Sequence, residues 1–383
     1  MSAPEIRDQE QAKRKEEREA GAFSPSALPP ALYRVPPEWG PHAATWIAWP
    51  HQAPDWPGKL EPIPWVYAEI VRVLHTHERV EILCHDESVR EDARRKLDAH
   101  GCDPSRYRLH IVPNDRGWLR DSAPTFALDA GGRVVLLNWR FNGWAKYDDY
   151  LFDEKIGVAI ERLTGHRRLT PERPDGRGWR LVLEGGSIDW NGEGVVMTTE
   201  ECLLSSVQCR NPGLSRSDYE TVFRDWLGAT RTIWLGEGCV GDDTHGHVDD
   251  VARFVSSDTV LLAYEEDPAD ENHARSADNL RRLKAFEGGR LRVVTMPYPR
   301  PVLMDGQRLP ASYANFYIAN DVVLVPTFND ANDRVALNAI TASLPGRTVI
   351  GIHSVDLVWG LGTLHCLTQQ EPQHRDSGLG DRK

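Results

Sequence analysis

The sequence predicts an α/β fold in which five small sheets close into a ring, and three observations indicate it. A unit of two apolar strands, a helical stretch and a further strand occurs four times. A fifth, less regular unit can be assembled from the two ends of the chain. Short turns join the first two strands in each of the four continuous units, and such repeats bury their apolar faces against their neighbours. We therefore expect one continuous domain.

The elements follow in order from the apolar runs and the turns between them. Strands are expected where apolar runs of four to seven residues flank a turn such as Asp129-Ala130-Gly131-Gly132 or Asn191-Gly192. Amphipathic stretches between units predict the helices. The predicted units are 125–128, 133–137 and a helix at 152–163; 187–190, 194–198, a helix at 216–227 and 231–235; 251–255, 259–263, a helix at 271–286 and 291–296; 315–318, 322–326, a helix at 333–343 and 347–353; and 364–368 beside 43–49, a helix at 64–76 and 80–83.

The chain of 383 residues, 40% of them hydrophobic, is long enough for a large core. Residues 1–28 are polar with alternating charge, which predicts a disordered or frayed tail. We expect one folded domain at 29–372 and a C-terminal tail at 373–383. The net charge of −12 disfavours nucleic acid and anionic membranes and favours a cationic small molecule.

The chain contains no apolar run of the roughly 18 residues that span a bilayer, and its N-terminus lacks the apolar segment of a signal peptide. A cytoplasmic protein is the expectation. The six cysteines include no C-x-x-C pair, so neither a disulfide framework nor a cysteine zinc site is indicated. A homodimer is left open.

Polar motifs occupy equivalent places in the repeat. Trp118-Leu119-Arg120-Asp121 precedes the first hairpin, Glu184-Gly185-Gly186 the second and His247-Val248-Asp249 the third, while Leu364-His365-Cys366 lies in the closing unit. Equivalent positions in a ring face one axis, so we expect these motifs to meet in one central pocket.

Residues 241–250 contain two histidines and four aspartates and lead into an apolar run. If the strand begins here, His247 and Asp249 share one face. That arrangement fits an acid/base histidine beside a carboxylate that holds a cation. It also fits a zinc site, because His245 adds a second imidazole.

Cys366 follows Gly360 and Gly362, which allow the main chain to approach a ligand closely. A cysteine reacts as the thiolate, which neighbouring cations favour. Asp121, Glu184 and Asp249 bring three carboxylates to the same pocket with no basic partner in their own motifs. Three carboxylates require a cation, and a planar guanidinium can be bound by them in bidentate fashion.

Together, these motifs resemble those of agmatine deiminases and bacterial peptidylarginine-deiminase-like proteins, of the guanidino-group-modifying superfamily. The resemblance extends over 37–372 and implies a five-bladed, pentein-like α/β propeller. The matching motifs are Glu38-Trp39 with 46–49, Trp118-Leu119-Arg120-Asp121, Glu184-Gly185-Gly186-Ser187, residues 244–249, residues 315–320, and His365-Cys366 with 368–370.

The resemblance implies that Cys366 is the nucleophile and His247 the general acid and base. It further implies that Asp121 and Asp249 hold the guanidinium, with Glu184 as another acidic pocket residue. Trp118 and Asp243 are expected at the substrate, Asp243 near its amine. The chain departs from the family in four places: Gly-Leu-Gly-Thr-Leu-His-Cys replaces Gly-Gly-Gly-Asn-Ile-His-Cys, Asp250 stands where Asn is common, and Ala123 and Asp321 stand where glycine is common.

The implied reaction is the hydrolysis of a small guanidino compound, with agmatine giving N-carbamoylputrescine and ammonia through a covalent cysteine intermediate and without metal or cofactor. Agmatine is favoured over free arginine, because no motif arginine is placed to receive an α-carboxylate unless Arg120 or Arg253 turns inward. The alternatives are a peptidylarginine or free-arginine deiminase, a zinc metallohydrolase built on His245, His247, Asp249 and Asp250, and a non-catalytic guanidino or polyamine binder.

Overall fold

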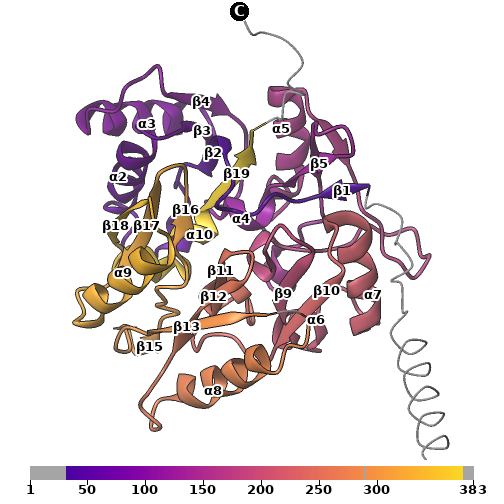
Figure 1. Ribbon diagram of the computed structural model, residues 1–383. Coiled ribbons are helices and arrows are strands. Elements are labelled where there is room, and N and C mark those ends of the chain that lie inside the picture. The colour runs from indigo at the N-terminus through magenta and orange to yellow at the C-terminus, as the bar shows by residue number, and fades with distance from the viewer. Residues whose placement is uncertain (1–31, 289, 374–383) are drawn as a thin grey trace, which may run out of the picture. The chain divides into compact units, whose positions relative to one another are not determined.

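The computed structural model describes residues 32–288 and 290–373, and Figure 1 shows their arrangement of mixed helices and strands. The predicted tail at 1–28 lies outside the described residues, as does the predicted C-terminal tail apart from Gln373. None of the described helices is long and apolar enough to cross a bilayer.

Five small sheets share one strand pattern: an antiparallel pair whose second strand also pairs in parallel with a third strand. Four of the antiparallel pairs are hairpins, and the fifth joins β19 to β2 from the two ends of the chain. The repeat predicted from the sequence is thus confirmed in strand order, and within the described ranges no sheet closes on itself. The sheets are β5 (Thr125–Asp129), β6 (Val134–Leu137) and β7 (Arg167–Leu169); β8 (Asp189–Trp190), β9 (Val195–Thr199) and β10 (Arg231–Leu235); β11 (Ala252–Ser256), β12 (Thr259–Tyr264) and β13 (Arg292–Pro297); β16 (Tyr317–Ile318), β17 (Val322–Thr327) and β18 (Thr348–His353); and β19 (Thr368–Pro372), β2 (His42–Ala48) and β3 (Arg79–Cys84).

Additional strands extend two of these sheets. β1 (Tyr33–Arg34) pairs with β5, and β4 (Tyr107–Ile111) pairs in parallel with β3. β14 (Leu303–Met304) and β15 (Gln307–Arg308) form a separate hairpin.

The longer helices are α2 (Ile63–Leu74), α3 (Glu87–Ala99), α5 (Ile156–Thr164), α7 (Arg216–Val222), α8 (Glu271–Lys284) and α9 (Asn332–Ser343). Single turns are α4 (Leu119–Ser122), α6 (Glu200–Leu204) and α10 (Leu364–Leu367), with short 3₁₀ or π segments at Ala53–Asp55, Gly143–Ala145, Asp153–Lys155, Gly185–Ser187, Phe223–Leu227, Val248–Asp250 and Leu357–Gly360.

In three of the five units, a helix joins the sheet to the sheet before it. α8 packs on its own β12 and on β10 of the preceding unit, α9 on β18 and β13, and α2 on β3 and β18. The interior strands β12 and β17 are apolar and buried along nearly their whole length, as expected for strands covered on both faces. The core is therefore continuous from one unit to the next.

The backbone differs from the prediction at two of the polar motifs. Residues 364–367 form the turn α10, because the side chain of Asn315 accepts hydrogen bonds from the main-chain N–H groups of His365 (3.0 Å) and Cys366 (3.3 Å). Residues 248–250 form a 3₁₀ turn, and β11 begins only at Ala252. The alternation argument for His247 and Asp249 therefore fails, although the two side chains still converge, as described below.

The sequence patterns missed α3 and β4. Helix α3 is strongly polar and exposes most of its surface, so its apolar stripe is reduced to Ala93 and Leu97. Its N-terminus carries a capping signal, since Asp86 accepts a hydrogen bond from the N–H of Val89 at 2.9 Å.

Candidate active site

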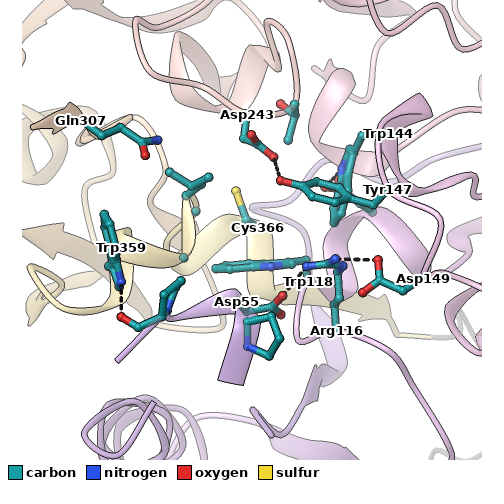
Figure 2. Close-up of a pocket in the computed structure, with 17 residues that line it drawn as sticks. Asp55, Arg116, Trp118, Trp144, Tyr147, Asp149, Asp243, Gln307, Trp359 and Cys366 are labelled. Carbon is teal, nitrogen blue, oxygen red and sulfur yellow. Dashed lines mark hydrogen bonds and ion pairs between the residues drawn. The ribbon is translucent and has the colours of Figure 1, made fainter. Parts of the chain in front are cut away.

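A cavity of about 370 Å³ opens beside Cys366. Figure 2 shows the Cys366 sulfur directed into this space, with the Trp118 ring on one side and Asp243 and Tyr147 on the other. The wall is formed by Pro54, Asp55, Pro57, Arg116, Trp118, Asp121, Trp144, Tyr147, Asp149, Asp243, Thr244, Gln307, Trp359, Gly360, Leu361, Gly362 and Cys366. These residues come from segments more than 300 positions apart.

The thiol of Cys366 is fixed from two sides. It accepts a hydrogen bond from Asn315 Nδ2 at 3.0 Å and lies 3.6 Å from Asp249 Oδ2. Burial raises the pKa of the thiol well above its usual range, and the nearby aspartates raise it further, while the Asn315 contact opposes them. The thiol is therefore protonated at neutral pH in the free protein. A cation bound among the aspartates offsets their effect and favours the thiolate.

Gly186 is the point where three predicted site residues meet. A Cβ atom at this position would lie 2.6 Å from His247 Nδ1 and 3.0 Å from both Asp121 Oδ1 and Asp249 Oδ2. Glycine is required here because any side chain would displace these groups. The structure thus brings His247, Asp121 and Asp249 together around one glycine.

Asp121 lies in α4 on the cavity wall. Its carboxylate accepts hydrogen bonds from the main-chain N–H of Gly186 at 3.0 Å and from Trp144 Nε1 at 2.9 Å. Burial raises its pKa to about 6; the carboxylates of Asp249 and Glu184 add to this effect, and His247 opposes it. The group is an anion at neutral pH that gains a proton on mild acidification.

His247 is fully buried between two carboxylates. Its Nδ1 atom lies 3.8 Å from Asp121 Oδ2, and its Nε2 atom lies 3.9 Å from Glu184 Oε2. Burial alone lowers the pKa of the imidazole, but Asp121, Cys202 and Glu184 outweigh burial and raise it well above the usual range. His247 is therefore an imidazolium with a proton to donate.

Two of the three carboxylates have basic partners outside their own motifs. Glu184 does not line the cavity; its Oε1 accepts a hydrogen bond from Arg210 Nε at 3.0 Å. Burial raises the pKa of Glu184, but Arg210 and His247 outweigh this and hold it at about 2. Asp249 Oδ2 contacts His365 Nδ1 at 2.7 Å. Arg210 lies in no motif, so the motifs could not reveal it, whereas His365 belongs to the Cys366 motif but its pairing with Asp249 was not predicted.

The two motif arginines turn inward but away from the cavity. Arg253 Nη2 donates to Glu38 Oε2 at 2.8 Å, and Arg120 Nη1 donates to Gln370 Oε1 at 2.8 Å. Neither side chain lines the cavity. Both therefore serve the buried network behind the site and cannot receive a substrate carboxylate.

Trp118 and Asp243 lie on the wall as the sequence predicts, but Asp243 already has partners. Tyr147 Oη donates to Asp243 Oδ2 at 2.7 Å, and Lys146 forms an ion pair with Oδ1. A Cβ on Gly362 would lie 2.8 Å from the Trp118 ring. Gly362 is therefore needed for the close packing of the Trp118 indole, and not, as predicted from the sequence, for the approach of the main chain to a ligand.

Arg116 is a wall residue that the sequence analysis missed. It forms ion pairs with Asp55 and with Asp149, the latter at 2.7 Å, and lies over the Tyr147 ring at 4.4 Å. Its position two residues before the Trp118 motif could have indicated that it lies near the cavity. These two carboxylates neutralise its guanidinium. The described wall carries four aspartates and one arginine, so acidic groups are in excess.

Trp144 was also missed, and its backbone is strained. Three consecutive residues, Gly143, Trp144 and Ala145, have φ values of 63°, 57° and 53°. Left-handed conformations cost about 1 to 2 kcal/mol for each non-glycine residue. In this conformation the Trp144 indole N–H donates to Asp121, and no sequence pattern marks the segment.

His245 takes no part in the site. Its Nε2 atom lies 2.9 Å from Ser205 Oγ, and its own backbone is left-handed at φ 65°. The side chains of His245, His247, Asp249 and Asp250 therefore do not converge on one point. The zinc metallohydrolase hypothesis, which required them as metal ligands, is not supported.

Comparisons with known proteins agree with this geometry. The family model described as Porphyromonas-type peptidyl-arginine deiminase matches residues 34–372. The chain is 33% identical over 366 residues to the agmatine deiminase of Ectopseudomonas mendocina, covering 89% of this chain and 95% of that one. The solved agmatine deiminase of Enterococcus faecalis superposes with a TM-score of 0.82 at 29% identity, covering 90% of this chain and 96% of the other. A substrate-bound agmatine deiminase from C. jejuni gives a TM-score of 0.80 at 27% identity, with coverage of 90% and 97%.

Proposed function

The chain belongs to the Porphyromonas-type peptidyl-arginine deiminase family, and from this premise we propose that it hydrolyses agmatine to N-carbamoylputrescine and ammonia. The observation that carries the proposal is the thiol of Cys366, directed into an acidic cavity with Asp121 on its wall and Asp249 behind the sulfur. Carboxylates on this side bind a guanidinium and place its central carbon at the sulfur.

In the first half of the reaction, the guanidinium lies against Asp121 and against Oδ1 of Asp249, which has no hydrogen-bond partner among the described residues. Its charge lowers the pKa of the thiol, and the thiol proton leaves to solvent. The Cys366 thiolate attacks the central carbon and forms a C–S bond. His247 gives its proton to one terminal nitrogen, the C–N bond breaks, and ammonia leaves. An amidino-thioether remains on Cys366.

In the second half, neutral His247 takes a proton from water, and the resulting hydroxide attacks the same carbon. The C–S bond breaks, and the sulfur leaves with its electron pair and takes up the proton of the added hydroxyl group. A neutral ureido product is released and the Cys366 thiol is restored. The chain's own residues and water account for every proton transfer, so no cofactor is required. Glu184, fixed by Arg210, keeps its negative charge near the imidazolium and favours the protonated ring.

We further infer that the five sheets are the blades of a five-bladed propeller. The support is their common strand pattern together with the three helices, α2, α8 and α9, that each join a sheet to the preceding one. A cytoplasmic location stays a prediction from the sequence, as does the division into one folded domain with two tails.

The pH dependence of kcat/KM for agmatine reports on Asp121. Because the pKa of Asp121 is raised to about 6, acidification through this range removes the negative charge that holds the guanidinium. We expect kcat/KM to fall as the pH drops below about 6, in a profile measured from roughly pH 5 to pH 8. A profile that stays flat to well below pH 6 would contradict this role.

Substrate preference tests the proposed function. The acidic wall favours agmatine, which carries two positive charges, and disfavours the carboxylate of arginine, which would enter a partly dry site unpaired. We expect kcat/KM for agmatine to exceed that for arginine and for benzoyl-arginine amide by at least about 100-fold, or roughly 3 kcal/mol. Ammonia and ureido product are both measured.

The Arg116→Gln variant sharpens this comparison. If Arg116 releases Asp149 to bind a carboxylate, the wild type uses arginine and the variant loses that activity. If kcat/KM for arginine or benzoyl-arginine amide equals or exceeds that for agmatine, agmatine is not the preferred substrate and another guanidino compound is. The absence of ammonia release from every guanidino compound would leave a non-catalytic binder.

A further inference from the structure

A second cysteine, Cys202, lies behind the catalytic histidine. It belongs to α6, whose N-terminus is fixed by Thr199: the N–H of Cys202 donates to Thr199 Oγ1 at 3.0 Å, and that hydroxyl donates to the carbonyl of Gly246 at 2.5 Å. The helix turn is thus tied to the residue immediately before His247. This contact was invisible in the sequence, because Cys202 and His247 are 45 positions apart.

Three atoms that can bind a metal converge at this place. One Glu184 oxygen, Cys202 Sγ and one His247 ring nitrogen all lie within 4.8 Å of one another, and all three residues are buried. A tetrahedral ion bound at about 2.0 to 2.3 Å separates its ligand atoms by roughly 3.5 Å, so a shift of about 1 Å completes the geometry. Thiolate, imidazole and carboxylate are the donors that zinc prefers.

Two of these donors make no hydrogen bond within the described ranges, although both are buried. Glu184 Oε2 and His247 Nε2 face each other at 3.9 Å, which is too far for a hydrogen bond. An unpartnered buried polar atom is costly, and its presence indicates a ligand that binds there for part of the time.

Arg210 does not compete for the free oxygen. Its Nε atom donates to Glu184 Oε1, its Nη1 donates to the carbonyl of Gln208 at 2.9 Å, and its Nη2 donates to the carbonyl of Thr244 at 2.5 Å. Every terminal nitrogen of the guanidinium is therefore held in place, and Oε2 of Glu184 stays directed toward Cys202 and His247. Thiolate and carboxylate together also balance the charge of a divalent ion.

We propose that Glu184, Cys202 and His247 form a binding site for a thiophilic divalent cation such as Zn²⁺, and that the bound ion inhibits turnover by occupying His247. This ligand set shares only His247 with the histidine and aspartate run considered from the sequence. Binding itself depends only on the three side chains. The inhibitory effect rests on the proposed function, in which His247 must exchange protons.

Cadmium is the probe for binding, because a cadmium–thiolate bond gives an ultraviolet charge-transfer absorption. The full-length Cys366→Ala variant removes the other thiol of the site. We expect it to bind one equivalent of Cd²⁺ with this absorption, and the Cys366→Ala/Cys202→Ser double variant to lose it. The matched control is Cys366→Ala/Cys209→Ser, since Cys209 lies on the loop beside Arg210, and it should keep the absorption.

The absorption surviving in the Cys202→Ser double variant, or failing to develop in Cys366→Ala at stoichiometric Cd²⁺, would overturn the site. Should the double variant not fold, X-ray absorption on Zn²⁺-loaded Cys366→Ala decides: one sulfur ligand supports the proposal and none refutes it. In the protein that keeps Cys366, the single variant Cys202→Ser should raise the Zn²⁺ concentration that half-inhibits agmatine hydrolysis by at least about 10-fold.

The two hypotheses fail separately. Ammonia release from agmatine is measured with the metal-free wild-type protein. Its absence would refute the proposed function and would not bear on the cadmium result. Absence of the cadmium absorption in Cys366→Ala would refute the metal-site proposal and would not bear on agmatine turnover.

Discussion

Replacement of Cys366 by alanine is expected to abolish agmatine hydrolysis, by at least about 10⁴-fold in kcat, because the covalent intermediate can no longer form. The thiol is buried and small, so alanine leaves the fold intact and the circular dichroism spectrum unchanged. Steady-state ammonia release measures the loss. A Cys366→Ala variant with full activity would exclude the covalent mechanism.

Alkylation gives an independent readout of the same residue. Iodoacetamide should inactivate the wild type, and agmatine should protect it. Because the pKa of the Cys366 thiol is raised, the inactivation rate of the free protein should increase steadily as the pH rises toward that pKa. Cys102→Ala, whose thiol lies beyond the end of α3, is the matched control and should keep turnover. A chelator should not reduce activity, and a loss that zinc restores would contradict the mechanism.

The second large effect is expected from the carboxylates that hold the guanidinium. Asp121→Asn and Asp249→Asn should each reduce kcat/KM by roughly 30-fold to several thousandfold, since a buried cation that loses a charged partner loses about 2 to 5 kcal/mol. The variants keep the shape of the side chain and remove only its charge. Retention of more than half the wild-type kcat/KM would mark that carboxylate as structural.

Asp149→Asn is the control for these variants. This carboxylate also lies on the cavity wall, but its side chain is 64% exposed and pairs with Arg116 near the surface. Exposed ion pairs contribute little, so its kcat/KM should stay within about threefold of wild type. A loss as large as that of Asp121→Asn would mean that general acidity of the wall, rather than two particular carboxylates, binds the substrate.

The sequence predicted the strands well because apolar runs and short turns are local signals. β10 was predicted at its observed bounds, and the hairpin of β5 and β6 was predicted within one residue at each end. The polar motifs were harder, because their conformation depends on distant side chains. Asn315, 50 positions away, turns the chain at His365, where the local pattern indicated a strand.

The candidate site shows the same limit. Motif spacing brought Cys366, His247, Asp121 and Asp249 to one place, because each occurs at the same point of a repeated unit. The partner Arg210 acts from a loop of the same unit as Glu184, His365 acts from another unit, and Trp144 acts through a left-handed backbone. A period in the sequence carries no information about these contacts.

The left-handed segment at Trp144 and Ala145 has a consequence for engineering this protein. Selection for melting temperature alone rewards changes that relax strained backbone, and these two positions offer such a gain. The same changes would free the indole that fixes Asp121 on the cavity wall. The most thermostable sequence for this fold and the most active one therefore differ at this dipeptide, and a useful catalyst must gain its heat resistance elsewhere.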